Sequence, residues 1–202
     1  DVFEASNLNR QLLSSVPLLG ASKAKAAADH IARVNPDVDV EAVPAFLTEG
    51  NAAEILAGCD IVLDALDNIP SRRILAVACE KANIPYIYGA IQGWVAQAAI
   101  SMPGDRLIDR LYPEEIEISD KSVLSFTPAL CASMQAALCV KLLTGRRVET
   151  GTDFYFDLLN QEFFESTLSK DVSCGVRDAL MMLQSCMKDV TDSSKHSSAL
   201  QS

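Results

Sequence analysis

The sequence contains no CxxC pair and only two histidines, His30 and His196, so it offers little from which to build a zinc site. Structural zinc in proteins is held by closely spaced Cys and His ligands, often arranged as CxxC pairs. The six cysteines of this chain instead stand far apart, mostly in apolar surroundings. We therefore predict no zinc, and we expect reduced and mostly buried thiols, as in cytosolic proteins.

Long hydrophobic runs are also missing. The longest, such as residues 61–63 and 136–140, are far too short to cross a bilayer. Residues 1–4 lack the basic and apolar regions of a signal peptide, and no initiator methionine is present. We therefore expect a cytoplasmic protein without membrane contact, and a chain that is a fragment of a longer one.

Positive charge is scarce as well. Lys and Arg number 17 against 27 Asp and Glu, which gives a formal net charge of -10. This balance does not suit a nucleic-acid surface, so we expect no nucleic-acid partner. With 202 residues, of which 49% are hydrophobic and 22% charged, the chain fits one globular domain with a substantial core.

The first half of the chain alternates segments that are typical of strands and helices. Apolar periodicity predicts helices at 22–34, 51–58 and 70–82, and strands at 38–43, 60–66 and 85–91. Ser22 is the expected N-cap of the first helix. This order indicates an α/β fold, with a mostly parallel sheet that carries helices on both faces.

The second half follows a different pattern. We expect a strand at 94–102, an irregular connection at 105–126, an apolar helix at 129–143, and a final antiparallel pair at 154–158 and 162–167. Residues 175–188 are a candidate helix, followed by a serine-rich end without fixed structure. The chain thus divides into a domain over 1–168, with an antiparallel extension at its C-terminal end, and a tail over 169–202.

Cationic and amide side chains are concentrated in Ser6–Gln11 (SNLNRQ), and Lys23 follows at the start of the first expected helix. Arg10 offers a planar fork of donors to phosphate oxygens, and Lys23 adds a compact charge. Within an acidic chain this pattern predicts a small anionic ligand such as a polyphosphate. The simpler alternative is that Asn7 and Gln11 fix a turn while Lys23 is an ordinary helix-surface lysine.

A second polar motif, Asp64–Asn68 (DALDN), ends an expected buried strand. Ligands of open α/β sheets bind at the carboxyl ends of strands. A carboxylate there, such as that of Asp67, can hold Mg²⁺, which in turn binds phosphate oxygens. The simpler alternative is that Asp67 and Asn68 only cap the following helix, on which Arg72 would be a solvated charge.

Together the two motifs resemble the ThiF/MoeB/HesA family, the ancestral relatives of ubiquitin-activating enzymes. Further matching pieces are Gly20, residues 33–36, Asp60, residues 84–85 with Gly89, residues 102–104, 135–136 and 141–145. The resemblance runs from Asp1 to about Thr167. It implies a Rossmann-like, mostly parallel sheet whose first βαβ part, with its glycine-rich turn, is missing from this chain.

The family resemblance implies a function in cofactor biosynthesis of the thiamine or molybdopterin type. The implied reaction is a nucleotidyl transfer, namely ATP-dependent adenylation of the C-terminal glycine of a small ubiquitin-like sulfur carrier that ends in Gly-Gly. A sulfur-donor protein would be a second partner, and the enzyme itself would form a homodimer. ATP and Mg²⁺ would be required.

The same resemblance assigns roles to seven residues. Arg10 and Lys23 would grip the β- and γ-phosphates, and Asp67 would hold Mg²⁺; these three would be catalytic. The remaining cofactor-binding residues would be Asn7, Gln11, Asn68 and Arg72.

The chain departs from the family pattern at three places. The glycine-rich turn is absent, and Gly58, Gly89 and Gly93 do not replace it, so we expect these 202 residues alone to bind ATP poorly. Both CxxC pairs of zinc-binding relatives are missing. No cysteine stands in the crossover between Asp105 and Phe126, which favours adenylation without a thioester, since Cys131 lies in an apolar helix.

Three other functions remain open from the sequence. A nicotinamide-dependent oxidoreductase would suit the sheet order but would not need SNLNRQ. A non-catalytic family member could act as a scaffold that binds a carrier or a partner subunit. A relative that activates a peptide or a tRNA base is the third.

Overall fold

A five-stranded mixed sheet forms the centre of the protein, seen in a computed structural model that describes residues 1–113 and 123–167. Its strands lie in chain order and are β1 (Val62–Leu63), β2 (Tyr86–Gln92), β3 (Val95–Ser101), β4 (Thr152–Asp157) and β5 (Glu162–Thr167). Strands β1 and β2 are parallel, with Val62 opposite Tyr86, and every later pair is antiparallel. The structure confirms the α/β class and the C-terminal antiparallel pair.

The described sheet has fewer parallel strand pairs than the mostly parallel sheet that the sequence indicated. The reason is the short connection at Gly93, whose φ of 53° closes a tight turn and forces β3 to run back along β2. A second tight turn at Gln161, with φ of 59°, joins β4 to β5. Only β1 therefore pairs in parallel, and it is much shorter than the strand expected over 60–66.

Helices cover both faces of the sheet, as predicted. On one face α3 (Ile69–Ala82) packs with α2 (Ala52–Ile55) and α4 (Leu107–Leu111), over side chains that include Tyr86 and Tyr88. On the other, α5 (Phe126–Leu143) packs over Ile87 through Leu138. Successive residues of β2 thus alternate between two cores, as the pleat of a strand requires.

Helix α5 is also, within the described residues, the one helix long and apolar enough to cross a membrane by length and composition. Its packing against β2 and β3 is that of a helix that covers a sheet. Its apolar character therefore has a structural explanation in the fold.

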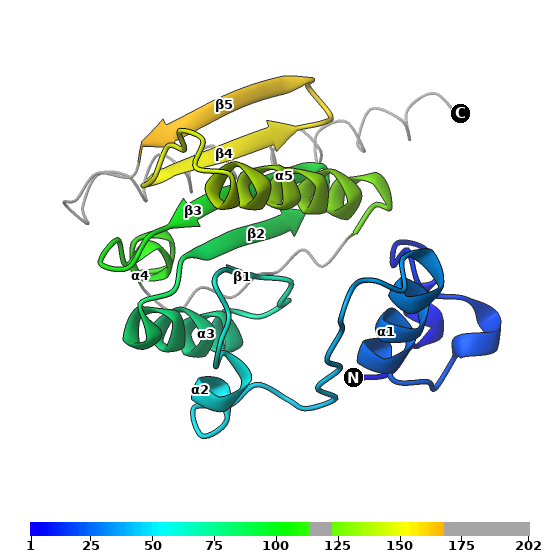
Figure 1. Cartoon of the computed structure of the whole chain (residues 1–202). Coiled ribbons are helices and arrows are strands. Elements are labelled where there is room, and N and C mark those ends of the chain that lie inside the picture. The colour runs from blue at the N-terminus through cyan, green and yellow to red at the C-terminus, as the bar shows by residue number, and fades with distance from the viewer. Residues whose placement is uncertain (114–122, 168–202) are drawn as a thin grey trace, which may run out of the picture.

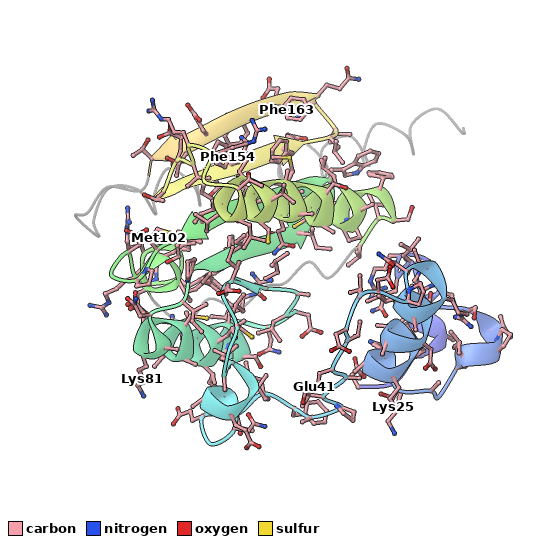
Figure 2. The ribbon with its side chains drawn as sticks, in the orientation of Figure 1. Lys25, Glu41, Lys81, Met102, Phe154 and Phe163 are labelled. Carbon is pink, nitrogen blue, oxygen red and sulfur yellow. The ribbon has the colours of Figure 1, made fainter. Side chains whose placement is uncertain are left out.

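The N-terminal part stands apart from the sheet in Figure 1, joined to it by an extended segment. Helix α1 (Lys23–Val34) begins as predicted, because the Ser22 hydroxyl accepts a hydrogen bond from the backbone N–H of Lys25. Figure 2 shows Lys25 pointing away from this helix, and Lys81 away from α3.

The strand expected at 38–43 does not form. Val38, Val40 and Val43 are all exposed, and the segment has no sheet partner within the described residues. An alternating pattern becomes a strand only when a neighbouring strand accepts its backbone hydrogen bonds. The prediction was wrong because the alternation of apolar and acidic residues is visible in the sequence, whereas the presence of a neighbouring strand is not.

Helices expected at 51–58, 70–82 and 129–143 correspond to α2, α3 and α5. The irregular connection at 105–126 contains the short helix α4 and then leaves the described part of the chain at residue 114. The candidate helix at 175–188 and the tail over 169–202 lie outside the described residues. The division at residue 168 therefore stays a prediction.

Candidate functional site

The SNLNRQ segment is a tightly hydrogen-bonded turn. A short 3-10 helix, Ala5–Asn7, opens it, and the Asn7 side chain accepts a hydrogen bond from the backbone N–H of Glu4 at 3.0 Å. The Asn7 carbonyl accepts from the N–H groups of Arg10 and Gln11. The buried Asn7 side chain thus supports the turn, in line with the simpler of its two predicted roles.

Arg10 is held locally but keeps no acidic partner. Its Nη1 atom donates to the Ser6 carbonyl at 2.6 Å and to Asn9 Oδ1 at 2.9 Å. No carboxylate pairs with it in the parts of the chain that the structure describes. The guanidinium is therefore oriented by neutral oxygens and retains its full positive charge for an anion.

Backbone pairing brings Lys23 next to this turn. Residues 1–3 bond to the segment 19–23, with Phe3 N–H donating to the Ala21 carbonyl and Lys23 N–H to the Asp1 carbonyl. The Lys23 ammonium forms an ion pair with Asp1 at 2.5 Å, and both side chains are partly exposed. Such a pair contributes little stability in water, so an incoming phosphate can replace Asp1.

Asp67 and Asn68 occupy the carboxyl end of β1, where the sequence placed them. Asn68 is the N-cap of α3, because its Oδ1 accepts from the backbone N–H of Ser71 at 2.9 Å. Its Nδ2 donates to Asp67 Oδ1 at 3.1 Å. Asp67 is exposed, and within the described residues no cationic side chain pairs with it. One open carboxylate fits Mg²⁺, which keeps several waters and also binds substrate phosphates.

The capping role of Asn68 gives a first testable prediction. Asn68→Ala should lower the free energy of unfolding by about 1 kcal/mol, because Ser71 N–H loses its acceptor. Urea titration followed by circular dichroism measures the change. A loss below about 0.3 kcal/mol would contradict the cap.

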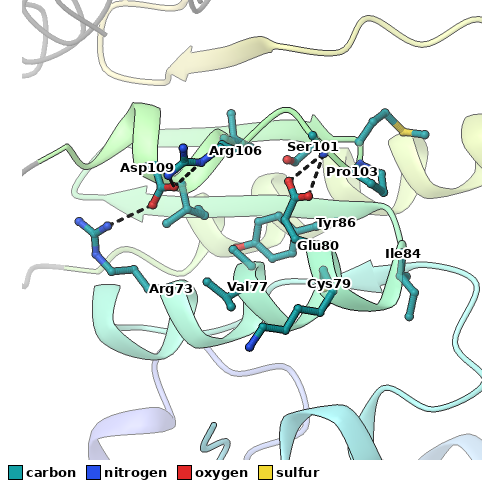
Figure 3. Close-up of a pocket in the computed structure, with 16 residues that line it drawn as sticks. Arg73, Val77, Cys79, Glu80, Ile84, Tyr86, Ser101, Pro103, Arg106 and Asp109 are labelled. Atoms are coloured by element: carbon teal, nitrogen blue, oxygen red, sulfur yellow. Dashed lines mark hydrogen bonds and ion pairs between the residues drawn. The ribbon is translucent and has the colours of Figure 1, made fainter.

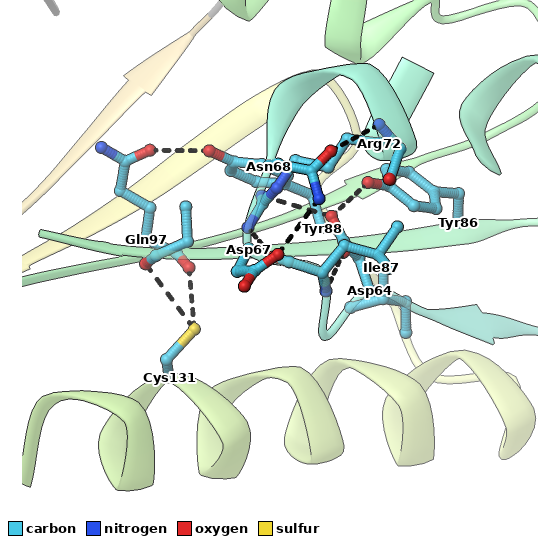
Figure 4. Close-up of polar contacts among 12 residues, drawn as sticks. Asp64, Asp67, Asn68, Arg72, Tyr86, Ile87, Tyr88, Gln97 and Cys131 are labelled. Carbon is cyan, nitrogen blue, oxygen red and sulfur yellow. Dashed lines mark hydrogen bonds and ion pairs between the residues drawn. The ribbon is translucent and has the colours of Figure 1, made fainter. Parts of the chain in front are cut away.

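Arg72 lies inside the protein, not on the helix surface as the simpler alternative would place it. Figure 4 shows its guanidinium above Tyr88, with 5.0 Å between the guanidinium carbon and the ring centroid. Nη1 lies 3.2 Å from Asp64 Oδ2, and Nη2 donates to the Leu66 carbonyl at 2.6 Å. The structure therefore gives Arg72 a buried partner, and its predicted contact with nucleotide remains an open prediction.

Sequence reasoning assigned no role to Asp64, which is buried beneath this loop. Its Oδ2 accepts from the Tyr86 hydroxyl at 2.5 Å, and its Oδ1 from the Leu66 N–H at 2.7 Å. Burial raises the pKa of Asp64, while the Arg72 guanidinium and the Tyr86 hydroxyl lower it. An acidic residue within an apolar strand was the signal that could have identified it.

The role of Gln135 was also missed. The side chain of this α5 residue lies against the sheet and donates from Nε2 to the Asp64 carbonyl at 2.7 Å and to the Ile87 carbonyl at 3.2 Å. It therefore ties β1 to β2 just beyond the last paired residue, Leu63. A lone amide in an otherwise apolar helix could have indicated a buried polar contact.

The predicted residues fall into two groups. Asn7, Arg10, Gln11 and Lys23 belong to the N-terminal part that ends in α1, and Asp67, Asn68 and Arg72 belong to the loop after β1 and the start of α3. Figure 1 shows these two parts of the chain apart from each other. No hydrogen bond or ion pair joins the two groups among the residues described. The N-terminal turn instead contacts Val123, whose carbonyl accepts from Asn9 Nδ2 at 3.3 Å and which bridges to Gly93.

None of the seven predicted residues lines the cavity of about 360 Å³ between α3, α4 and the ends of β2 and β3. Figure 3 shows Glu80 reaching across it, where its carboxylate accepts from the Gly104 N–H at 2.9 Å. Arg73 and Arg106 both pair with Asp109 at its rim. These polar groups hold the turn 102–105 and α4 in place.

The described cysteines include no reactive thiol at the predicted site. Burial raises the pKa of Cys79 and of Cys131 to about 11, so both stay protonated at neutral pH. Cys59 is exposed, which corrects the expectation of mostly buried thiols at that position. Within residues 1–113 and 123–167 no cluster of Cys, His, Asp or Glu could hold a metal by itself, and Cys174 and Cys186 lie outside them.

Comparison with solved structures supports the fold. Escherichia coli MccB with ATP superimposes with a TM-score of 0.70 at 17% identity, covering 87% of this chain and 56% of that one. PaaA gives a TM-score of 0.67 at 21% identity, covering 84% and 62%. At such identities the likeness shows a shared α/β architecture.

Sequence comparison identifies the family. The SAMP-activating enzyme E1 of Haloferax volcanii is 34% identical over 171 residues, which are 81% of this chain and 63% of that protein. The molybdopterin-synthase adenylyltransferase of Escherichia coli is 29% identical over 183 residues, 87% of this chain and 74% of that one. The chain thus spans less than two thirds of the Haloferax protein. The ThiF family model matches residues 1–176, and the chain belongs to the ThiF family.

Proposed function

We propose that the protein adenylates the C-terminal glycine of a small ubiquitin-like sulfur carrier, using ATP and Mg²⁺. The observation that carries the proposal is the exposed Asp67 carboxylate, which stands without a cationic partner at the carboxyl end of β1 in the described chain. The names of the relatives support it. One of them is the sulfur carrier protein adenylyltransferase of Thermus thermophilus, 32% identical over 189 residues, which are 87% of this chain and 70% of that one.

In this proposal the substrate carboxylate attacks the α-phosphorus of ATP, and the bond to the pyrophosphate oxygen breaks. Negative charge then builds up on the departing pyrophosphate, where Arg10 and Lys23 stabilise it. Asp67 holds the metal, and Mg²⁺ when bound neutralises charge on the phosphate oxygens. Gln11, the residue after Arg10, helps to shape the phosphate-binding site in this proposal. No protein nucleophile is required, consistent with the protonated thiols of Cys79 and Cys131.

The remaining parts of the proposal concern partners. The carrier ends in Gly-Gly, a separate protein donates the sulfur, the enzyme works as a cytoplasmic homodimer, and the product belongs to a thiamine or molybdopterin type of pathway. The acidic net charge of -10 favours a protein substrate over a nucleic acid.

Carrier-dependent ATP–pyrophosphate exchange tests this function. The full-length protein should exchange labelled pyrophosphate into ATP only when a carrier with an intact C-terminal glycine is present. The same carrier without its last glycine is the matched control. Exchange that is absent with every carrier, while the protein still binds one, would instead support a non-catalytic scaffold.

A further inference from the structure

The buried guanidinium of Arg72 contacts the backbone of the loop that carries Asp67. Its side chain is 8% exposed, and that of its partner Asp64 is 0% exposed. Nη2 donates to the Leu66 carbonyl at 2.6 Å, while Nη1 lies 3.2 Å from Asp64 Oδ2. The Tyr88 ring lies against the guanidinium, so these neighbours leave little of it open to a nucleotide.

Leu66, the residue before Asp67, is held at both backbone polar groups. Its N–H donates to Asp64 Oδ1 at 2.7 Å, and its carbonyl accepts from Arg72. Both members of the Asp64–Arg72 ion pair thus bind the backbone of the same residue, Leu66. A loop fixed in this way has little freedom to turn the next side chain.

Two further residues fix Asp64 itself. The Tyr86 hydroxyl donates to its Oδ2 at 2.5 Å, and Gln135 Nε2 donates to its carbonyl at 2.7 Å. The Tyr86 contact, visible in Figure 4, comes from β2, and the Gln135 contact comes from α5, so the loop is attached both to the sheet and to a helix that covers it. The position of Leu66 is therefore set by the rigid core and not by the loop alone.

Stability alone does not explain a buried ion pair at this place. The desolvation cost of two buried charges often cancels their attraction, and apolar replacements of similar volume can be equally stable. The contacts of Arg72 and Asp64 instead converge on one loop. At known metal sites, side chains that orient a metal-binding residue without touching the metal commonly contribute about 10-fold to 100-fold to metal affinity.

We propose that Arg72, through Asp64 and Leu66, is a positioning residue that orients the Asp67 carboxylate for its metal, and that it does not bind the nucleotide. This inference rests on the proposed function, in which Asp67 holds Mg²⁺. It replaces the role that the family resemblance gave to Arg72. It also assigns a function to Asp64, which had none.

The test compares Arg72→Lys with Arg73→Lys in the full-length protein. Lysine keeps the charge but offers no planar fork to join Asp64 and Leu66. Arg73 follows on the same helix and pairs with Asp109 at 3.4 Å, so it is the matched control. Electron paramagnetic resonance measures the affinity for Mn²⁺ in the presence of a non-hydrolysable ATP analogue, without turnover.

We expect Arg72→Lys to weaken Mn²⁺ binding by about 10-fold or more and Arg73→Lys to leave it unchanged. Metal-free affinity for the analogue, measured in EDTA, should be the same in Arg72→Lys as in the wild type. A loss of that metal-free affinity would show that Arg72 binds phosphate and would overturn the inference. Unchanged Mn²⁺ binding in a folded Arg72→Lys would overturn it as well.

Tyr86→Phe is the second variant, in case Arg72→Lys does not fold. It leaves the ion pair intact and removes one donor from Asp64, so Mn²⁺ binding should weaken about 3-fold. Unchanged Mn²⁺ binding in Tyr86→Phe would count against the inference.

Asp67→Ala distinguishes a failure of the proposed function from a failure of this inference. If Asp67→Ala retains wild-type Mn²⁺ binding, the proposed metal role of Asp67 fails and the inference fails with it. If Asp67→Ala loses the metal but Arg72→Lys and Tyr86→Phe do not, the inference alone is wrong.

Discussion

Asp153→Asn should make the protein more stable at pH 7.5, by about 2–4 kcal/mol, and should leave it nearly unchanged at pH 4. Asp153 lies in β4 and is fully buried, and neither carboxylate oxygen has a hydrogen bond of good geometry. Burial raises its pKa from 3.8 to about 8, although the nearby Tyr155 hydroxyl lowers it in part. The folded protein therefore holds a neutral carboxyl group at neutral pH.

The direction of this pH dependence follows from the number of protons that Asp153 binds in the folded and unfolded states. Between about pH 4 and pH 8 the folded state keeps the Asp153 proton while the unfolded state has released it. The free energy of unfolding therefore falls as pH rises, by up to about 1.4 kcal/mol per pH unit for this one group. Asparagine cannot ionise, so the variant removes that slope.

Urea titrations of wild type and Asp153→Asn at pH 4, 6 and 7.5 measure the difference. Asp60→Asn provides the matched control, since it makes the same substitution at an exposed carboxylate. A difference between wild type and Asp153→Asn that is the same at all three pH values would contradict a neutral, buried Asp153.

Gly89→Ala should lower the free energy of unfolding by about 2–4 kcal/mol. A Cβ atom at Gly89 would lie 2.4 Å from the side-chain carbon Cδ of Gln135 and 2.5 Å from its Nε2. The Gln135 side chain is flexible in principle, but here it is buried and donates to the carbonyls of Asp64 and Ile87. Moving it aside would leave both buried carbonyls without this donor.

Gly50→Ala is the control for this change. A Cβ atom at Gly50 would meet nothing closer than 3.8 Å, so the same substitution should cost little there. Equilibrium unfolding in urea measures both variants. Equal, small losses for Gly89→Ala and Gly50→Ala would show that Gln135 does not occupy the space above Gly89.

The sequence predicted those parts of the fold that local patterns determine. Ser22 capped its helix as expected, and the apolar periodicity of α3 and α5 placed both helices within a few residues. The alternation at 38–43 misled because pairing depends on a neighbouring strand. The direction of β3 depended on a two-residue turn at Gly93, which the mostly parallel prediction did not weigh.

The candidate site was predictable to a similar degree. Asp67 and Asn68 stand at the strand end where the motif placed them, and Asn68 also has the capping role considered as the alternative. The role of Arg72 depends on tertiary contacts with Asp64 and Tyr88, which form only when the loop after β1 and strand β2 pack against α3. Sequence spacing put Arg72 one turn beyond Asn68 but could not show which way its side chain turns.

The most direct test of an adenylation site at the end of β1 is ATP–pyrophosphate exchange by the full-length Asp67→Ala variant with its carrier. Glu54→Ala serves as the control, since it removes an exposed carboxylate of α2 and leaves the metal-binding one in place. We predict that exchange falls by about 100-fold or more in Asp67→Ala while Glu54→Ala keeps most of it. Exchange that persists at the wild-type rate in Asp67→Ala would contradict the central claim.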